Sequence, residues 1–206
     1  MGNNSSQYDE GGSSQQVHQP VFRPQSEPIL SGDKHPGKTN ITPKMKQWVK
    51  GNNVKCFMVY ANGLKISWAE DERHWLFHNI ETSDGEITVA VLRGVCWLEV
   101  HGKLHTSKLT HGVTYQVAFL IMVEETAYGF QVPVNFRLTL PNGSKQEHRE
   151  EHLSQKPKEE WLRIPIGEFK TSPENQGEIE FSLYEFEGGN QKKGLVIKAV
   201  SIEPKM

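Results

Sequence analysis

The sequence predicts an all-β fold, an antiparallel β-sandwich of jelly-roll type that follows a disordered N-terminal tail. Apolar residues recur at every second position in several short segments, as in Ile179, Phe181 and Leu183. This alternation is typical of strands with one face in a core and the other in solvent. Turn sequences such as Asn62-Gly63 and Asp84-Gly85 separate the segments. Neither a helical heptad nor a βαβ alternation occurs, so a sandwich is the favoured architecture.

The first half of the folded part holds four main expected strands, each apolar or alternating and bounded by turn residues. They span Phe57–Tyr60, Ile87–Leu92, Val95–Val100 and Thr114–Val123. The last of these is the longest and alternates most clearly, with Tyr115, Val117, Phe119, Ile121 and Val123 on one face. A short strand at 64–67 precedes a charged run.

The second half holds four more expected strands. They span Val134–Leu140, Trp161–Ile166, Glu178–Phe186 and Leu195–Ile202. The turn Pro141-Asn-Gly143 ends the first, and Gly188-Gly-Asn190 follows the third. Both turns combine residues that tolerate the sharp backbone conformations of short connections.

Residues 1–44 differ in composition from the rest of the chain. They are rich in Ser, Gln, Gly, Asn and Pro, and their four acidic and four basic residues cancel. Such a segment buries too little apolar surface to offset chain entropy, so we expect a disordered tail at 1–44 and one domain at 45–206. The start matches an N-myristoylation pattern at Gly2. A single myristoyl chain would give only marginal, reversible membrane attachment.

Net charge and hydropathy limit the classes of partner that the protein can bind and the compartment in which it is expected. The net charge of -2 gives no case for nonspecific nucleic-acid binding, and no apolar run approaches the roughly 18 residues of a membrane span. The N-terminus lacks the apolar region of a secretory signal, so a cytoplasmic or nuclear protein is expected. Cys56 and Cys96 should be free thiols in such a reducing compartment, and whether either cross-links on oxidation stays open.

Motifs for catalysis are weak, and we expect no enzyme, metal or cofactor. His148-Arg-Glu-Glu-His152 matches the H-x-x-E-H pattern of a zinc peptidase, but it lies in a polar stretch without an apolar helix face. No G-x-S-x-G or phosphate-binding loop is present. A glycosidase stays open as an alternative, because it needs only two carboxylates about 5–9.5 Å apart across a groove.

The segment from Lys65 to Phe77 is the strongest pointer to a ligand. Trp68 and Trp75 lie seven residues apart, with the charged run Glu70–Arg73 between them. Flat aromatic rings on a polar loop suit a ligand with alternating apolar faces and hydroxyl groups, which describes a sugar. The alternative is that both rings cap the end of a core and that the charges form a solvated turn.

An ordered series of motifs from about Trp48 to the C-terminus, roughly three-quarters of the chain, resembles the phloem protein 2 family of plant lectins, in particular its A-type members. The motifs are Ile66-Ser-Trp68, His74-Trp75-Leu-Phe77, Val95–Lys103, Tyr128-Gly-Phe130, Trp161–Phe169, Gly177–Glu185, Lys193–Lys198 and Ile202–Lys205.

The resemblance implies a β-sandwich lectin of the cytoplasm, the nucleus or the phloem sap, commonly a homodimer. Lectins of this family bind N-acetylglucosamine oligomers (chitooligosaccharides) and the cores of N-glycans without a metal or catalysis. The family's binding tryptophans fall on Trp68 and Trp75, and two of its glutamates on Glu178 and Glu185. Tobacco-type members carry a third Trp where this chain has Phe77, so altered binding strength is expected.

Seven residues are expected to bind the carbohydrate. They are Trp68, Trp75, Phe77, Arg73, Glu185, Asn190 and Lys192. Trp75 is the first choice for the stacking ring, because it directly follows the charged loop. Strict alternation places Glu178 and Glu185 on opposite faces of their strand. Trp97 and Trp161 belong to strand motifs and are assigned to packing. A phloem protein-interaction or RNA-carrying module without sugar binding is the alternative function.

Overall fold

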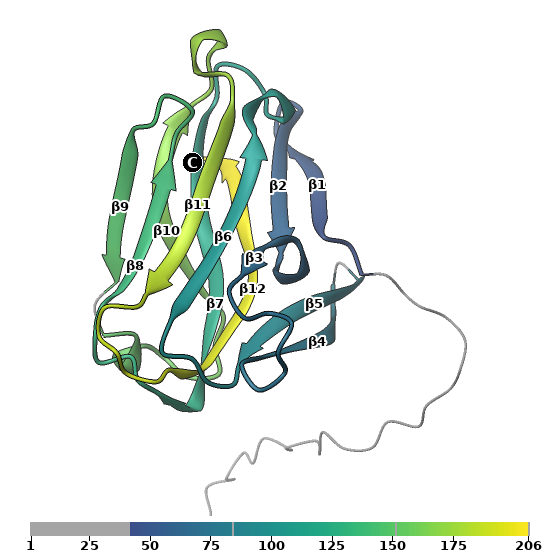
Figure 1. The fold of residues 1–206 in the computed structure, drawn as a ribbon. Coiled ribbons are helices and arrows are strands. Elements are labelled where there is room, and N and C mark those ends of the chain that lie inside the picture. Colours follow the sequence, from purple (N-terminus) through teal and green to yellow (C-terminus); the bar gives the residue numbers. More distant parts are fainter. Residues whose placement is uncertain (1–41, 84, 151, 206) are drawn as a thin grey trace, which may run out of the picture. The chain divides into compact units, whose positions relative to one another are not determined.

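The computed structural model describes residues 42–83, 85–150 and 152–205, which form two antiparallel β-sheets (Figure 1). The strands are β1 (Met45–Lys50), β2 (Val54–Tyr60), β3 (Lys65–Ile66), β4 (Trp75–Thr82), β5 (Gly85–Leu92), β6 (Leu98–His105), β7 (Thr114–Tyr128), β8 (Val134–Thr139), β9 (Lys145–Glu150), β10 (Leu162–Lys170), β11 (Glu178–Glu185) and β12 (Lys193–Pro204). Four single-turn 3-10 helices lie between them: η1 (Ala61–Gly63), η2 (Thr106–Lys108), η3 (Leu153–Gln155) and η4 (Pro173–Asn175). The predicted all-β sandwich is confirmed.

Sheet A is organised around the long C-terminal strand β12. One edge of β12 pairs with β7, which in turn pairs with β10. Its other edge is shared, because Val196–Ile197 pair with β5 and Ala199–Ile202 pair with β2. Strands β1 and β4 complete the two ends of this arrangement. Sheet B has the order β3-β6-β11-β8-β9 and lies in front of β7, β12 and β10 in Figure 1.

The core fills the space between the two sheets with the residues that alternation predicted. Phe119 of β7 packs edge-on against Phe136 of β8 and Phe181 of β11, with ring centroids 5.6 and 6.5 Å away. Gly102 of β6 is required by this packing, since a Cβ there would lie 2.1 Å from the Phe181 ring. All three phenylalanines are fully buried, so the inner faces of the two sheets are locked together.

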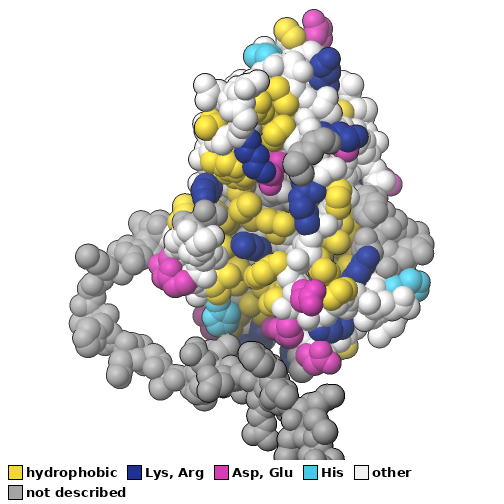
Figure 2. Space-filling view, turned by 180° about the vertical axis from the view of Figure 1, so that it is seen from behind, with side chains coloured by type: hydrophobic (Ala, Val, Ile, Leu, Met, Phe, Trp, Pro, Cys, Tyr) yellow, Lys and Arg dark blue, Asp and Glu magenta, His cyan; other side chains and the backbone are white. Residues whose placement is uncertain are grey.

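The outer face of sheet A carries a second, smaller apolar cluster. Tyr60, Ile87, Val89, Val196 and Ala199 form its centre, and they alternate with neighbours that face the main core. Figure 2, seen from behind, shows hydrophobic side chains with lysines and arginines among them on this side of the molecule. The two outer faces therefore differ in chemistry, and only that of sheet B presents the aromatic site described below.

Three strands were absent from the sequence prediction: β1, β4 and β9. Residues 75–77 were expected in a polar loop, yet they begin β4. The H-x-x-E-H pattern begins on the edge strand β9, where no helix presents its residues to a metal.

The expected disordered tail and the lipidation pattern at Gly2 fall almost entirely outside the described residues. Within the described residues, Cys56 and Cys96 are free, and no helix is long and apolar enough to cross a bilayer.

Candidate functional site

The outer face of sheet B, at the beginning of β6, carries a row of aromatic rings that we call the aromatic shelf: Trp68, Trp97, Phe186 and Tyr184. Trp97 stacks on Phe186 with a centroid distance of 4.4 Å and an interplanar angle of 14°. Phe186 stacks in turn on Tyr184 at 5.6 Å, and the Arg137 guanidinium lies 4.8 Å from the Tyr184 centroid. Because these rings are stacked face to face, the apolar surface they leave to a ligand is the Trp97 face turned away from Phe186, together with the ring edges.

Trp68 and Trp97 line an open hollow together with Ser67. Its volume is about 470 Å³, within the range of small-molecule sites. The Trp68 side chain is 57% exposed and that of Trp97 is 48% exposed. Trp68 adopts a left-handed backbone conformation with φ 67°, which is unusual for a bulky residue. Such a conformation costs about 1–3 kcal/mol and is found preferentially at functional sites.

The polar floor beside the hollow is organised by Glu99. Its Oε2 accepts hydrogen bonds from Trp97 Nε1 at 2.9 Å and from Ser67 Oγ at 3.1 Å. Its Oε1 lies 2.8 Å from His101 Nε2, and the other nitrogen of that imidazole lies 3.1 Å from Glu180. The hydrogen bonds from His101 and Trp97 hold the pKa of Glu99 below its ordinary value. The site therefore combines exposed indole rings with an ionised hydrogen-bond acceptor.

Trp75 does not belong to this surface, and its prediction as the stacking ring is wrong. The side chain is 1% exposed and packs in the core between the sheets. Its Nε1 donates to the Ser67 carbonyl at 3.1 Å, and its backbone N donates to the Asp71 carbonyl at 3.0 Å. Trp75 thus anchors both ends of the turn that presents Trp68.

Replacing Trp75 by Phe is expected to lower the free energy of unfolding by about 1–3 kcal/mol. The smaller ring leaves the Ser67 carbonyl without its buried donor and underfills the core. Urea unfolding followed by circular dichroism would measure the change. An unfolding free energy within 0.5 kcal/mol of the wild type, on the order expected of surface changes, would contradict the anchoring role.

Glu185 and Lys192, expected to contact a sugar, are instead buried against each other as an ion pair. Lys192 Nζ also donates to the Cys96 and Asn190 carbonyls, both at 2.9 Å. Glu185 Oε1 accepts from the Gly188 backbone N at 2.7 Å. Neither group lines the hollow between Trp68 and Trp97. Because Cys96 precedes Trp97 and Glu185 precedes Phe186, the pair fixes the two backbone segments that carry the stacked rings.

The remaining predicted residues are exposed but scattered. The Arg73 guanidinium donates several hydrogen bonds to the Asp71 carboxylate, and these lower the pKa of that carboxyl to about 2. Phe77 is 37% exposed on β4 in sheet A. Asn190 is exposed and contributes its carbonyl to Lys192. Glu178 pairs with Lys103 at 2.7 Å on the outer face, opposite the inward Glu185, as alternation predicted. None of these four residues lines the hollow.

Trp97 and Trp161, which were assigned to packing, are 48% and 41% exposed. Trp97 lies on the aromatic shelf. Trp161 instead lies beside sheet A, where the Nζ atom of Lys198 is 5.3 Å from its ring centroid. A sequence signal for Trp97 was present, because Leu98 and Val100 alternate into the core. That period places Trp97, Glu99 and His101 together on the outer face.

The family model and the sequence relatives point to one family. The family model for phloem protein 2 matches residues 54–204, which includes the shelf and all strands except β1. The protein PHLOEM PROTEIN 2-LIKE A1 of Arabidopsis thaliana is 41% identical over 169 residues, covering 80% of this chain and 69% of the relative. A lectin of Luffa acutangula is 38% identical over 157 residues, covering 76% of this chain and 74% of that lectin. The chain belongs to the phloem protein 2 family.

Proposed function

We propose that the protein is a lectin that binds N-acetylglucosamine oligomers and N-glycan cores in the hollow between Trp68 and Trp97. The observation that carries the proposal is the pairing of two half-exposed indole rings with the ionised Glu99, which lies beside the hollow and accepts from Trp97 and Ser67. The similarity to the lectin of Luffa acutangula supports carbohydrate binding as a property of the family.

Each part of such a ligand has a counterpart in the site. The C–H face of a pyranose ring lies favourably on an indole, and the methyl of an acetamido group adds apolar contact. A carboxylate has about four acceptor positions, and Glu99 uses three of them for His101, Trp97 and Ser67. A sugar hydroxyl can donate to the fourth. The edges of the Phe186 and Tyr184 rings, which are stacked behind Trp97, lengthen the apolar surface, and a longer surface suits an oligomer better than a single sugar.

The proposal includes a homodimer that acts in the cytoplasm of phloem cells. An open site of this kind binds one glycan weakly, about -8 to -4 kcal/mol, so two sites engaged together would supply the avidity. The half-buried hydrophobic side chains around the cluster on sheet A, Met58, Val91, Leu120 and Met122, offer a surface on which two copies could pair. Light scattering of the full chain at several concentrations tests the dimer, and a single 23.4 kDa species throughout would refute it.

Catalysis on the glycan is not part of the proposal. Glu99 and Glu180 share His101, but a glycosidase requires one carboxylic acid with a raised pKa. The pKa of Glu99 is lowered. This favours a fixed acceptor over a general acid.

An RNA-carrying module remains the second candidate, because cation–aromatic pairs lie outside the shelf. Lys198 lies 5.3 Å from the Trp161 ring, and Lys46 lies 6.0 Å from the Trp48 ring. Aromatic and cationic groups together suit single-stranded nucleic acid. Binding of an oligouridylate that weakens with salt and with Trp161→Ala would favour this function.

Calorimetric titration of chitotriose into the full chain tests the proposal, with maltotriose as the control without acetamido groups. We expect chitotriose to bind in the micromolar to millimolar range and maltotriose to bind at least about tenfold more weakly, the loss of one hydrogen-bonded contact. Equal affinity for the two trisaccharides would exclude recognition of N-acetylglucosamine.

The lowered pKa of Glu99 predicts a specific pH dependence. A carboxyl whose folded pKa lies below its unfolded value stabilises the fold above the unfolded pKa, ordinarily 4.5. That stability is lost as the pH falls through the folded pKa. The difference in unfolding free energy between the wild type and Glu99→Gln should therefore be largest near pH 6 and shrink below about pH 4.5. A difference that stays constant from pH 7 to pH 3 would contradict the assignment.

A further inference from the structure

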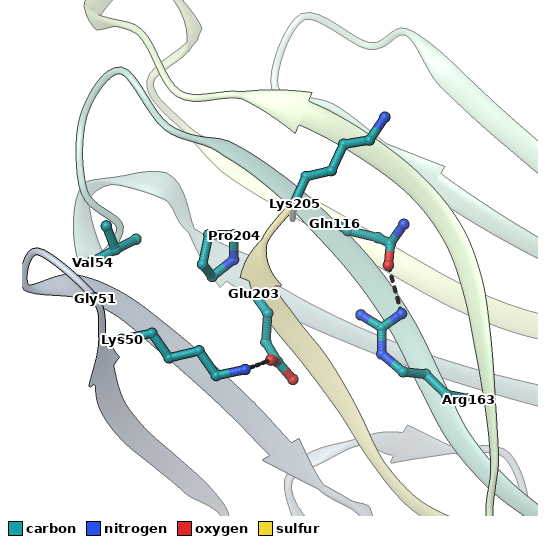
Figure 3. Close-up of a pocket in the computed structure, with 8 residues that line it drawn as sticks. All are labelled: Lys50, Gly51, Val54, Gln116, Arg163, Glu203, Pro204 and Lys205. Atoms are coloured by element: carbon teal, nitrogen blue, oxygen red, sulfur yellow. Dashed lines mark hydrogen bonds and ion pairs between the residues drawn. The ribbon is translucent and has the colours of Figure 1, made fainter.

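A second hollow of about 580 Å³ lies on sheet A, away from the aromatic shelf (Figure 3). Its lining comes from four separate parts of the chain: the β1–β2 turn, β7, β10 and the end of β12. The lining residues are Lys50, Gly51, Val54, Gln116, Arg163, Glu203, Pro204 and Lys205. None of them is among the expected carbohydrate-binding residues or lines the hollow between Trp68 and Trp97.

The charges around this hollow do not cancel. Lys50 forms an ion pair with Glu203, and Lys205 forms one with Glu168 at 2.7 Å. Arg163 donates to the neutral Gln116 Oε1 at 2.5 Å and has no carboxylate partner among the described residues. In Figure 3, Lys50 and Arg163 lie on either side of Glu203. One uncompensated positive charge therefore remains at the guanidinium.

The site fits a monoanion better than a polyanion. A guanidinium presents its N–H groups in a planar arrangement that matches a carboxylate. Among the described residues, one of the five N–H groups of Arg163 donates to Gln116, which leaves four for a ligand. A dianionic phosphate would add a second negative charge beside Glu203 and Glu168, whose charges are already matched by Lys50 and Lys205.

The rest of the lining is apolar. Val54 and Pro204 contribute carbon surface, and the methylene stems of Lys50, Arg163 and Lys205 add to it. The volume exceeds what an isolated acid group would fill and falls within the range of small-molecule pockets. The apolar body of a ligand would lie against these groups while its acid group meets Arg163.

We propose that the sheet A hollow is a binding site for a small amphipathic monocarboxylate, with Arg163 as the group that recognises its carboxylate. The site is separate from the glycan site, because the two hollows share no lining residue and lie on different sheets. Occupancy of one is therefore expected to leave the affinity of the other unchanged.

Titration of the ¹⁵N-labelled full chain with octanoate, followed by amide chemical shifts, tests the proposal. Octanoate is expected to shift the signals of Gly51, Val54 and the Gln116 side chain while the Trp68 and Trp97 indole signals stay in place. Octanamide, which has the same body without the charge, and acetate, which has the charge without the body, should each bind at least about fivefold more weakly.

Arg163→Gln should weaken octanoate binding about five- to tenfold, the loss of one charge-assisted pair, because Gln keeps a polar, exposed side chain without the charge. Arg93→Gln, a change at an exposed arginine outside the hollow, should leave it within about twofold. Shifts centred on other residues, equal binding of octanamide or acetate, or an unchanged affinity in Arg163→Gln would each overturn the proposal.

Discussion

Lys192→Met should lower the free energy of unfolding by about 3–5 kcal/mol, the usual loss when one partner of a buried ion pair is removed. Met has nearly the length of Lys, so the change removes the charge and little volume. Lys192 is 0% exposed and Glu185 is 3% exposed, so solvent compensates poorly for the lost ammonium. Glu185 Oε2 has no other hydrogen-bond partner among the described residues, and the Cys96 and Asn190 carbonyls would lose their donor as well.

Guanidinium-induced unfolding of the full chain, followed by tryptophan fluorescence, measures this loss. Lys193→Met is the matched control, and as a change at a half-buried neighbour outside the pair it should cost under about 1 kcal/mol. The double variant Lys192→Met with Glu185→Leu should recover much of the stability, since it removes the stranded carboxylate. A loss below about 1 kcal/mol in Lys192→Met would contradict the assigned ion pair.

Trp97→Ala should weaken the binding of chitotriose about thirtyfold or more, which corresponds to the roughly 2 kcal/mol or more of a tryptophan hot spot. The substitution removes one wall of the hollow, the ring that stacks on Phe186 and one donor to Glu99. The fold should tolerate it, because about half of the Trp97 surface is already in water.

The matched control for Trp97 is Trp161→Ala, which removes a similarly exposed ring from sheet A. It should leave chitotriose affinity within about twofold of the wild type, since no ring contact of the shelf involves it. Comparable losses in both variants, measured by calorimetry, would show that the affinity does not depend on the shelf.

Period-2 alternation predicted the core well because burial repeats along each strand. It placed Ile179, Phe181 and Leu183 on one face, and all three are fully buried. The prediction failed at a strand boundary, where the alternation was not applied. Residues 95–100 were treated as one packed strand, whereas β6 begins at Leu98 and leaves Trp97 on the surface.

The exchange of roles between Trp75 and Trp97 has a physical cause that local sequence does not contain. A charged neighbourhood favours exposure, and the run before Trp75 is charged. The run nevertheless folds into a turn in which Asp71 accepts from both His74 N and Trp75 N, and this turns Trp75 inward. Likewise, the sequence predicts Glu185 and Lys192 to be surface residues, because charged side chains are usually exposed. Only the tertiary structure brings the two together as a buried ion pair.

The most direct test of the carbohydrate site uses the five tryptophan indole N–H signals of the full chain as reporters during titration with chitotriose. We expect the signals of Trp68 and Trp97 to shift with a common saturation curve. Those of Trp75, Trp48 and Trp161 should stay in place, because Trp75 is buried and the other two belong to sheet A, Trp48 within β1 and Trp161 directly before β10. Saturable shifts confined to Trp48 or Trp161, or no shift at any indole, would contradict a glycan site on the aromatic shelf.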